Sequence, residues 1–249
     1  MTESQKIAVV TGASSGIGAA TATALAREGY RLLLGARRIE RLKRLTDELG
    51  GAPGVEFHAL DVTDPASVRK FVSQLDRLDL VVNNAGAAFG LDSVEHAVEE
   101  RWKAMFELNV MGVLRMTRAL LPALRAAGDG HVINVGSTAS FEVYPGGGGY
   151  TASKHAERAL TRTLRLELLG EPIRVTEVCP GMADTEFSKV RFSGDRSRAE
   201  AVYRGMTPLS AEDVAECIVW AATRPPHVNV DEIVVRPRDQ ATSTDVHRR

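Results

Sequence analysis

Seven short apolar runs, rich in leucine and β-branched residues, recur along the chain, and longer stretches with helical spacing separate them. The runs cover residues 7–11, 31–36, 55–59, 78–83, 131–135, 173–179 and 232–235. Such alternation predicts βαβ units. Several runs are apolar at successive positions, as in LDLVV and HVINV, which suits strands buried on both faces of a parallel sheet. We therefore expect an α/β fold, with a doubly wound parallel sheet and helices on both of its faces.

One domain over residues 1–249 is expected, because no linker or internal repeat divides the chain and its length suits a single α/β domain. With 44% hydrophobic and 25% charged residues, the chain can bury a core and does not look disordered. Helical spacing is lost over 180–210, directly after a predicted strand. We expect a substrate lid there, with a disordered loop as the alternative. The polar tail 242–249 should fray unless something holds it.

Composition and charge exclude several classes of protein. The chain has 31 Lys and Arg against 32 Asp and Glu, a formal net charge of -1, so no general field attracts nucleic acid or an anionic membrane. It opens without a signal-peptide pattern, and no apolar run reaches the roughly 18 residues of a membrane span, so we expect a cytoplasmic protein. Cys179 and Cys217 are expected to be small buried hydrophobes, and the scattered histidines predict no metal site.

The segment from 98 to about 125 predicts a helix that is apolar on more than one face. Residues such as Trp102, Phe106 and Leu121 do not share one stripe. Such a helix needs cover on a second side. A partner subunit would supply it, which predicts a homo-oligomer, either a dimer or a tetramer. The alternative is a deep core helix in a monomer.

A glycine-rich turn, TGASSGIG at residues 11–18, follows the first predicted strand and opens a helical pattern. Glycines there let backbone amides and a helix N-terminus approach a pyrophosphate. The spacing is neither GxGxxG nor that of a P-loop, since no GK[ST] follows. The alternative is a tight connection that binds nothing. We expect a dinucleotide to contact Gly12, Ser14, Ser15, Gly16, Ile17 and Gly18.

The end of the second run predicts which dinucleotide binds. An NAD site would place an acidic residue there for the ribose 2′-hydroxyl, but this chain has Arg37 and Arg38. Two guanidinium groups can pair with a 2′-phosphate, which predicts NADP. The alternative is a solvated basic start to the next helix.

Polar and small residues also follow the third and fourth runs, where ligands of open α/β sheets bind. These candidate cofactor contacts are Asp61, Val62, Asn83, Ala85 and Gly86. Asp61 could accept a hydrogen bond from an adenine amino group. A role in turn formation is the alternative for each of them.

The stretch YTASK places Tyr150 four residues before Lys154, so the two side chains share one face of a predicted helix. A free phenol has a pKa near 10, and a nearby cation favours the phenolate, so the pair could transfer a proton near neutral pH. Ser137 follows a predicted strand and could hydrogen-bond a substrate carbonyl in the same cleft. Asn109, polar within an apolar helix, should need a buried partner.

Together, TGASSGIG, NNAG, the Asn of LNVMG, the Ser of VGSTAS, YTASK and the PG of CPGMADTEF make the chain resemble the classical short-chain dehydrogenase/reductase family along nearly its whole length. The resemblance implies a single Rossmann-like domain, commonly a dimer or homotetramer. It also implies an oxidoreductase that moves a hydride between a nicotinamide and a carbonyl or alcohol carbon.

The resemblance also implies roles for individual residues. Tyr150 looks like the general acid/base, Lys154 its partner that also holds the nicotinamide ribose, and Ser137 the group that orients the substrate. Asn109 resembles the residue that anchors a water in the proton relay. Residues implied at the two ends of the cofactor are the NADP-selecting Arg37 and Arg38, and Pro180, Gly181 and Thr185 against the nicotinamide.

The C-terminal third is similar to the NADP-dependent 3-hydroxy acid, or serine, dehydrogenases of bacteria. The segments that carry this narrower resemblance are TEFSKVRFSGD, SAEDVAECIVW, TRPPHVNVDEIVVRPRDQ and the closing VHRR. It implies a 3-hydroxy acid such as serine, allo-threonine or 3-hydroxyisobutyrate, or a small semialdehyde. A substrate carboxylate needs a cationic partner, which we expect to be Arg191 in the lid, with a solvated charge as the alternative. Lys189 is the other cation that this part of the lid offers.

Two other functions stay open from the sequence. One is an NADPH-dependent carbonyl reductase for a ketone or secondary metabolite. The other is a non-catalytic sensor that binds NADP(H) and turns nothing over. The complete set of Asn109, Ser137, Tyr150 and Lys154 argues against a sensor, because a pure binder needs no acid/base pair.

Overall fold

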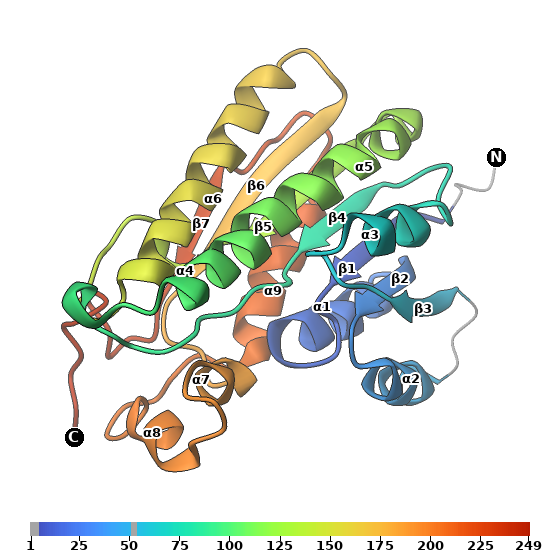
Figure 1. Ribbon diagram of the computed structural model, residues 1–249. Helices are drawn as coiled ribbons and strands as arrows, with labels where there is room; N and C mark the ends of the chain where they lie inside the picture. Colours follow the sequence, from blue (N-terminus) through green and yellow to red (C-terminus); the bar gives the residue numbers. More distant parts are fainter. Residues whose placement is uncertain (1–4, 51–53) are drawn as a thin grey trace.

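The computed structural model describes residues 5–50 and 54–249, so residues 1–4 and 51–53 of the predicted domain lie outside the described residues. A seven-stranded sheet in the order β3-β2-β1-β4-β5-β6-β7 forms its centre (Figure 1), and all neighbouring strands are parallel. The strands are β1 (Ile7–Thr11), β2 (Arg31–Ala36), β3 (Val55–Ala59), β4 (Leu80–Asn83), β5 (Gly130–Val135), β6 (Ile173–Pro180) and β7 (Glu232–Val235).

Helices cover both faces of the sheet. They are α1 (Gly16–Arg27), α2 (Ile39–Glu48), α3 (Pro65–Val72), α4 (Glu99–Phe106), α5 (Gly112–Ala127), α6 (Gly148–Glu167), α7 (Glu186–Arg191), α8 (Arg196–Ala201) and α9 (Ala211–Ala222). In β2, Leu32 and Leu34 join the core beneath α1, α2 and α9, whereas Leu33 joins the core beneath α3, α5 and α6. This alternation is the two-sided burial that the continuous apolar runs predict. The doubly wound α/β prediction is confirmed.

The strand order reverses direction between β1 and β4. After β1 the chain builds outward to β2 and β3, then crosses back to β4 on the other side of β1 and continues outward to β7. At such a switch point, the loops beyond the carboxyl ends of the two strands diverge and leave a crevice. The glycine turn after β1 and the NNAG segment after β4 therefore lie at one edge of the sheet.

The fourth strand begins two residues later than predicted. Leu78 donates its amide to the Ala123 carbonyl of α5 at 3.0 Å instead of joining the sheet ladder. Asp79 bridges to β1, because its side chain accepts a hydrogen bond from the Ile7 amide at 2.8 Å. Residues 78 and 79 thus anchor the strand to α5 and β1 before regular pairing starts at Leu80.

The predicted helix over 98–125 is divided by a π-helical turn at Glu107–Met111, with α4 before it and α5 after it. The wider turn holds Asn109 in the interior. Its side-chain amide donates to the Ala87 carbonyl and accepts from the Ala87 amide, at 2.9 and 3.0 Å. π-turns inside helices occur frequently at functional sites.

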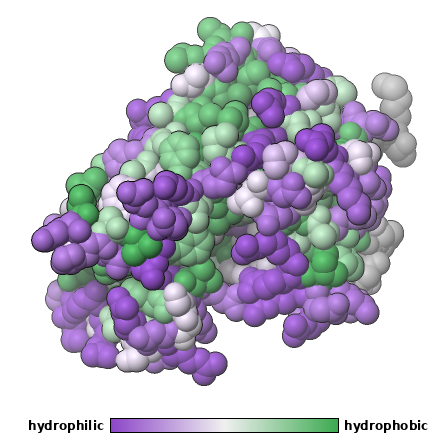
Figure 2. Space-filling model, in the orientation of Figure 1, coloured by the Kyte–Doolittle hydropathy of each residue, from purple (hydrophilic) through white to green (hydrophobic). Residues whose placement is uncertain are grey.

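Local elements cover only part of the second apolar face. Trp102 of α4 packs closely on Gly148 and Gly149 at the start of α6, where an added Cβ would lie 2.9 Å from the indole. Phe106, by contrast, stays 46% exposed. Figure 2 shows apolar surface over α5 and α6 on this side of the molecule. A homo-oligomer remains a prediction, with the exposed part of this face as its candidate contact.

The segment over 180–210 is helical rather than irregular, because it contains α7 and α8. Thr185 and Asp195 accept hydrogen bonds from backbone amides in the first turns of these helices, at 3.2 and 3.1 Å. The tail is held against the end of this segment. Arg249 donates its amide to the Gly205 carbonyl at 2.8 Å, and the Arg248 guanidinium donates to the Arg204 carbonyl at 2.5 Å. The tail 242–249 is therefore held by these hydrogen bonds, as it must be if it is not to fray.

We expect the free energy of unfolding to depend on pH because of the buried His131 in β5. Burial, with smaller contributions from Arg174 and Lys6, lowers the pKa of His131 to about 3. Below pH about 6.5, His131 is protonated in the unfolded chain but stays neutral in the folded chain. The free energy of unfolding therefore falls as the pH falls from about 6.5 towards 3. Between pH 7.5 and 5.5 this residue costs about 1.4 kcal/mol. Urea unfolding of wild type and His131→Asn at both pH values should show that extra loss only in wild type. Equal losses in both proteins would contradict the expectation.

Candidate active site

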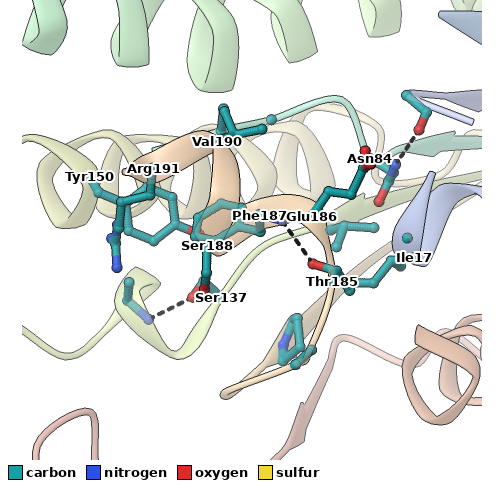
Figure 3. Close-up of a pocket in the computed structure, with 18 of the residues that line it drawn as sticks. Ile17, Asn84, Ser137, Tyr150, Thr185, Glu186, Phe187, Ser188, Val190 and Arg191 are labelled. Atoms are coloured by element: carbon teal, nitrogen blue, oxygen red, sulfur yellow. Dashed lines mark hydrogen bonds between the residues drawn. The ribbon is translucent and has the colours of Figure 1, made fainter. Parts of the chain in front are cut away.

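A cavity of about 580 Å³ opens at the carboxyl edge of the sheet, between the strand ends and the segment 180–210. Figure 3 shows Tyr150 and Arg191 together at one end of it, away from Ile17 and Asn84. The structure brings most of the candidate residues into its lining: Gly12, Ser14, Ser15, Gly16, Ile17, Arg37, Arg38, Asp61, Val62, Ala85, Gly86, Ser137, Tyr150, Lys154, Pro180, Gly181, Thr185 and Arg191.

The glycine turn is built to keep side chains out of this cavity. Gly12 and Gly16 have φ values of 66° and 53°, in the left-handed region that favours glycine. Asn84 supports the turn from β4 by donating its side-chain amide to the Thr11 carbonyl at 2.9 Å. A Cβ on Gly12 would lie 2.9 Å from the Asn84 side chain. Gly12 and Gly16 therefore present backbone without a side chain to a ligand at the start of α1.

Two of the predicted cofactor contacts do not line the cavity. Asn83 points into the protein, where its side chain donates to Thr117 and Asn134 at 3.0 and 2.9 Å. Neighbouring residues at a strand end face opposite ways, and the lining residue is Asn84, one position later. Gly18 is a packing position, because a Cβ there would lie 2.5 Å from the Gly12 carbonyl oxygen.

Arg38 lies at the junction of three segments that meet beside the β2 end. Its guanidinium donates to the hydroxyls of Ser14 and Ser15, at 3.1 and 2.7 Å, and to the carboxylate of Glu186 at 2.8 Å. Arg41 donates to the same carboxylate at 2.7 Å, and the Arg41 and Arg38 hydrogen bonds outweigh burial and lower the pKa of Glu186 to about 2. This basic cluster next to the glycine turn has the chemistry that a sugar phosphate needs. Sequence reasoning missed Arg41 and Glu186 as members of the cluster.

Asp61 occupies the lining just after β3. Its Oδ1 accepts hydrogen bonds from the Thr63 amide and hydroxyl, at 2.9 and 2.7 Å. Burial would raise the pKa of Asp61, but these bonds and the nearby Arg37 guanidinium lower it. Asp61 is therefore an ionised acceptor at neutral pH, fixed in orientation by Thr63.

The catalytic candidates converge from β5 and α6. Ser137 follows β5, where its hydroxyl accepts from the Ala139 amide at 3.1 Å and caps a short 3₁₀ turn at Thr138–Ser140. Tyr150 and Lys154 lie one turn apart on α6. The Tyr150 ring packs edge-on against Phe187 of α7, with 5.4 Å between ring centroids. All three side chains face the cavity, as YTASK and VGSTAS predict.

Lys154 is almost wholly buried, and its ammonium is held by two acceptors. It donates to the Val135 carbonyl at 2.8 Å and to the Glu157 carboxylate at 2.6 Å. Burial alone would lower the pKa of Lys154, but Glu157 outweighs it and the pKa is raised. Burial raises the pKa of Glu157 to about 7 in spite of Lys154. Sequence reasoning missed Glu157, because a glutamate three residues after a lysine on a helix usually marks a solvated surface pair.

Asn109 does not line the cavity, although it lies close behind it. Besides its two bonds to Ala87, its side-chain amide donates to the Ser153 hydroxyl of α6 at 3.0 Å. The buried partner that the sequence predicts is therefore Ala87 together with Ser153. Asn109 joins the π-turn, the loop after β4 and the helix that carries Tyr150.

Arg191 enters the cavity from α7, above the aromatic end. Its guanidinium carbon lies 5.2 Å from the Tyr150 ring centroid and 5.5 Å from that of Phe187. It donates to the Tyr144 hydroxyl at 2.5 Å. Within residues 5–50 and 54–249, its buried Nε has no hydrogen-bond partner. A half-buried cation that lines the cavity beside Tyr150 is suited to an anionic group.

The chain after β7 contributes lining residues that sequence reasoning missed, namely Gln240, Ser243 and Arg248. Gln240 accepts a hydrogen bond from the Met182 amide at 2.8 Å. Glu142, close to Ser137, accepts from the Ser243 amide and hydroxyl at 2.7 Å. The loop that follows β5 and the C-terminal segment thus hold each other beside the substrate end of the cavity.

No cluster of three or more potential metal-ligating side chains occurs in the described part of the chain. The helices described there also include none with both the length and the apolar content needed to span a bilayer. Cys179 is buried and Cys217 is partly buried, and both are free thiols.

Comparisons with known proteins agree with this geometry. A family model described as short chain dehydrogenase matches residues 6–196. An uncharacterized oxidoreductase of Mycobacterium tuberculosis is 56% identical, over 96% of this chain and 94% of its own. A sulfoacetaldehyde reductase of Chromohalobacter salexigens is 44% identical, over 94% of each chain. The NADP-dependent 3-hydroxy acid dehydrogenase YdfG of Escherichia coli is 38% identical, over 97% of this chain and 99% of its own.

A solved structure, the closed form of serine dehydrogenase complexed with NADP⁺, has a similar fold. It superposes with a TM-score of 0.91 at 38% sequence identity, covering 98% of this chain and all of the other. The similarity therefore includes the segment 180–210 and most of the C-terminal segment, as well as the sheet.

Proposed function

The chain belongs to the short-chain dehydrogenase family, and on that premise we propose that this oxidoreductase uses NADP(H) and acts on a small 3-hydroxy acid or its carbonyl counterpart. The observation that carries the substrate class is Arg191, a half-buried guanidinium that lines the cavity beside Tyr150. The relatives named for 3-hydroxy acids, serine and sulfoacetaldehyde support the same class, because each of those substrates carries an anionic group.

The residues present fit NADP. Gly12 and Gly16 leave room beside the α1 N-terminus for a pyrophosphate, and Arg37 and Arg38 lie where a 2′-phosphate would meet them. Asp61 is the acceptor for the adenine end. The residues proposed to pack at the nicotinamide end are Pro180, Gly181 and Thr185, with backbone contacts from Ala85 and Gly86. When bound, NADP(H) exchanges a hydride with the substrate carbon.

Tyr150 manages the proton in the proposed mechanism. In oxidation its phenolate takes the proton of the substrate hydroxyl, and in reduction its phenol returns it to the carbonyl oxygen. Lys154 stabilises the phenolate by its charge, and Ser137 donates a hydrogen bond that orients the substrate oxygen. The water-anchoring role of Asn109 stays a prediction, since its side chain already has three partners.

Substrate selection is proposed to occur beside the Tyr150 ring, at Arg191. The Tyr144 hydroxyl fixes one end of the Arg191 guanidinium, and the Gly90 amide donates to the Arg191 carbonyl at 2.9 Å. These contacts join the lid helix to the loop that precedes α6 and to the loop after β4, beside the proposed substrate position. A carboxylate or a sulfonate placed on Arg191 would bring the neighbouring carbon groups towards Tyr150.

Replacing Arg191 by methionine is expected to raise KM for an anionic substrate by about 10- to 100-fold, because a charge-assisted hydrogen bond is lost. KM for a neutral alcohol or aldehyde should change little. Lys189→Met is the matched control, since Lys189 lies exposed on the same lid helix. Steady-state kinetics of both variants with paired anionic and neutral substrates measure this. An equal rise for both substrates would remove Arg191 from substrate selection and favour a reductase of neutral ketones.

Replacing Arg38 by alanine is expected to raise KM for NADP by about 10- to 100-fold and to leave KM for NAD nearly unchanged. The 2′-phosphate is the only group that distinguishes the two cofactors. Arg44→Ala, an exposed change on α2, controls for general charge effects. Parallel initial rates with NADP and NAD give the comparison. If KM rose equally for both cofactors, Arg38 would be binding a shared part of them.

A further inference from the structure

Glu157 is a buried carboxylate that belongs to none of the motifs in the sequence. It is 1% exposed and lies on the same side of α6 as Lys154, one turn further along the helix. Its Oε2 accepts from the Lys154 ammonium at 2.6 Å, both groups being almost fully buried. An ion pair so deeply buried interacts more strongly than one in water, so Glu157 must affect whatever Lys154 does.

The ammonium of Lys154 has three hydrogens, and two of them are committed. One points to the Val135 carbonyl of β5 and one to Glu157. Only one is left to face the cavity, so the direction of the Lys154 charge is fixed by its two buried partners. Of these two partners, the Glu157 carboxyl can carry a charge and the Val135 carbonyl cannot.

Other charged and titratable groups face this pair from the elements packed against it. From β6, Glu177 lies beneath the turn that carries Ser137, and within residues 5–50 and 54–249 its Oε1 is buried without a hydrogen-bond partner. Arg158 of α6 lies 3.9 Å from Glu177 and 2.6 Å from Glu232 of β7. The Tyr144 hydroxyl and Arg191 lie beside the Tyr150 ring, and the Cys179 thiol lies beside Glu177.

Arg158 balances Glu177 and Glu232 at a distance from Lys154, whereas Glu157 bonds to Lys154 directly. A positive charge beside a phenol favours the phenolate, and a carboxylate bonded to that positive charge weakens the effect. Burial raises the pKa of Glu157 to about 7, so this carboxyl is charged through the alkaline range in which a phenol would lose its proton.

We infer that Glu157 is a positioning residue that holds the Lys154 ammonium against Val135 and, when ionised, offsets part of its charge, so that Lys154 favours the Tyr150 phenolate less than an unpaired lysine would. Oxidation, which needs the phenolate, should therefore extend to lower pH once the Glu157 charge is removed. The inference rests on the proposed function, because it takes Tyr150 as the acid/base.

The test is the pH profile of kcat/KM for oxidation in Glu157→Gln, recorded from about pH 6 to about pH 10. Glutamine keeps the shape and can still accept from Lys154, but it removes the charge. The acid limb of this pH profile is expected to shift to lower pH by about one unit. At a fixed pH on that limb, kcat/KM should therefore rise about tenfold. A carboxylate that merely stabilises the fold would not move the limb.

Two further variants control the experiment. Glu167→Gln makes the same chemical change at an exposed site near the end of α6, and its profile should overlay that of wild type. Glu177→Gln removes a buried charge that does not bond to Lys154, so its limb should move in the same direction by less. If Glu157→Gln does not fold, Glu177→Gln carries the test, and an unmoved limb there overturns the inference.

Failure of the inference differs from failure of the proposed function. An active wild type, an inactive Tyr150→Phe and coinciding profiles for wild type and Glu157→Gln would overturn the inference alone. A wild type without NADP-linked turnover, or a fully active Tyr150→Phe, would overturn the proposed function on which it rests.

Discussion

Replacing Tyr150 by phenylalanine is expected to lower kcat by about 10²- to 10⁴-fold while leaving cofactor affinity and stability nearly unchanged. The change removes one hydroxyl and keeps the ring that packs on Phe187 and beneath Arg191. The loss therefore measures proton transfer and not the shape of the cavity. Single-turnover rates, fluorescence titration with NADPH and thermal unfolding separate the three quantities.

Tyr144→Phe is the matched control, because it removes a hydroxyl from the same cavity. That hydroxyl accepts a hydrogen bond from Arg191, so its loss should act on KM for an anionic substrate more than on kcat. A fall in kcat as large as that of Tyr150→Phe would contradict the assignment of the two tyrosines. So would a Tyr150→Phe enzyme that keeps more than about a tenth of the wild-type kcat.

Replacing Lys154 by methionine is expected to cost both activity and stability. Activity should fall at least about 100-fold, because the phenolate loses its cation. The buried Glu157 carboxylate loses its partner, which costs about 3–5 kcal/mol of the free energy of unfolding when it is ionised. Burial already raises the pKa of Glu157 to about 7, so the carboxyl can take up a proton as the pH falls below that. The destabilisation should thus be larger at pH 8 than at about pH 6, measured by urea unfolding.

The double variant Lys154→Met with Glu157→Met separates the two losses. An apolar pair of similar size leaves no uncompensated charge, so stability should return to near the wild-type value. Activity should stay lost, because the cation is still missing. Recovery of activity in the double variant would show that Lys154 serves only to neutralise Glu157. A Lys154→Met protein as stable as wild type at both pH values would contradict the buried pair.

The sequence predicts the sheet well because its signal is local. Runs such as LLLGA, and the LVV of the fourth strand, carry apolar or small residues at successive positions, which is typical of a strand buried on both faces. The short helices over 180–210 are harder to predict, because each has only six residues and shows no full period of apolar spacing. Their caps, Thr185 and Asp195, are the signals that could have found them.

The candidate site likewise contains residues that the sequence predicts and residues that it does not. The glycine turn, Ser137, Tyr150 and Lys154 are recognisable because the spacing along one strand end or one helix face places them. Gln240 is not recognisable because it joins the site through tertiary packing, and Glu157 is not recognisable because only the packing of α6 shows that it is buried. Asn83 illustrates a different limit, since one residue along a strand decides whether a side chain faces the cavity or the interior.

We propose that this protein exchanges a hydride between NADP(H) and small anionic substrates. Initial rates of the wild-type enzyme test this proposal. The panel pairs L- and D-serine, allo-threonine, 3-hydroxyisobutyrate and 3-hydroxypropionate with neutral secondary alcohols, and tests sulfoacetaldehyde and small semialdehydes in the reverse direction with NADPH. Each reaction is run with both NADP and NAD cofactors. We expect turnover of at least one anionic substrate, with NADP preferred over NAD, and no comparable turnover of the neutral alcohols. Preference for neutral carbonyl compounds, or for NAD, would contradict it.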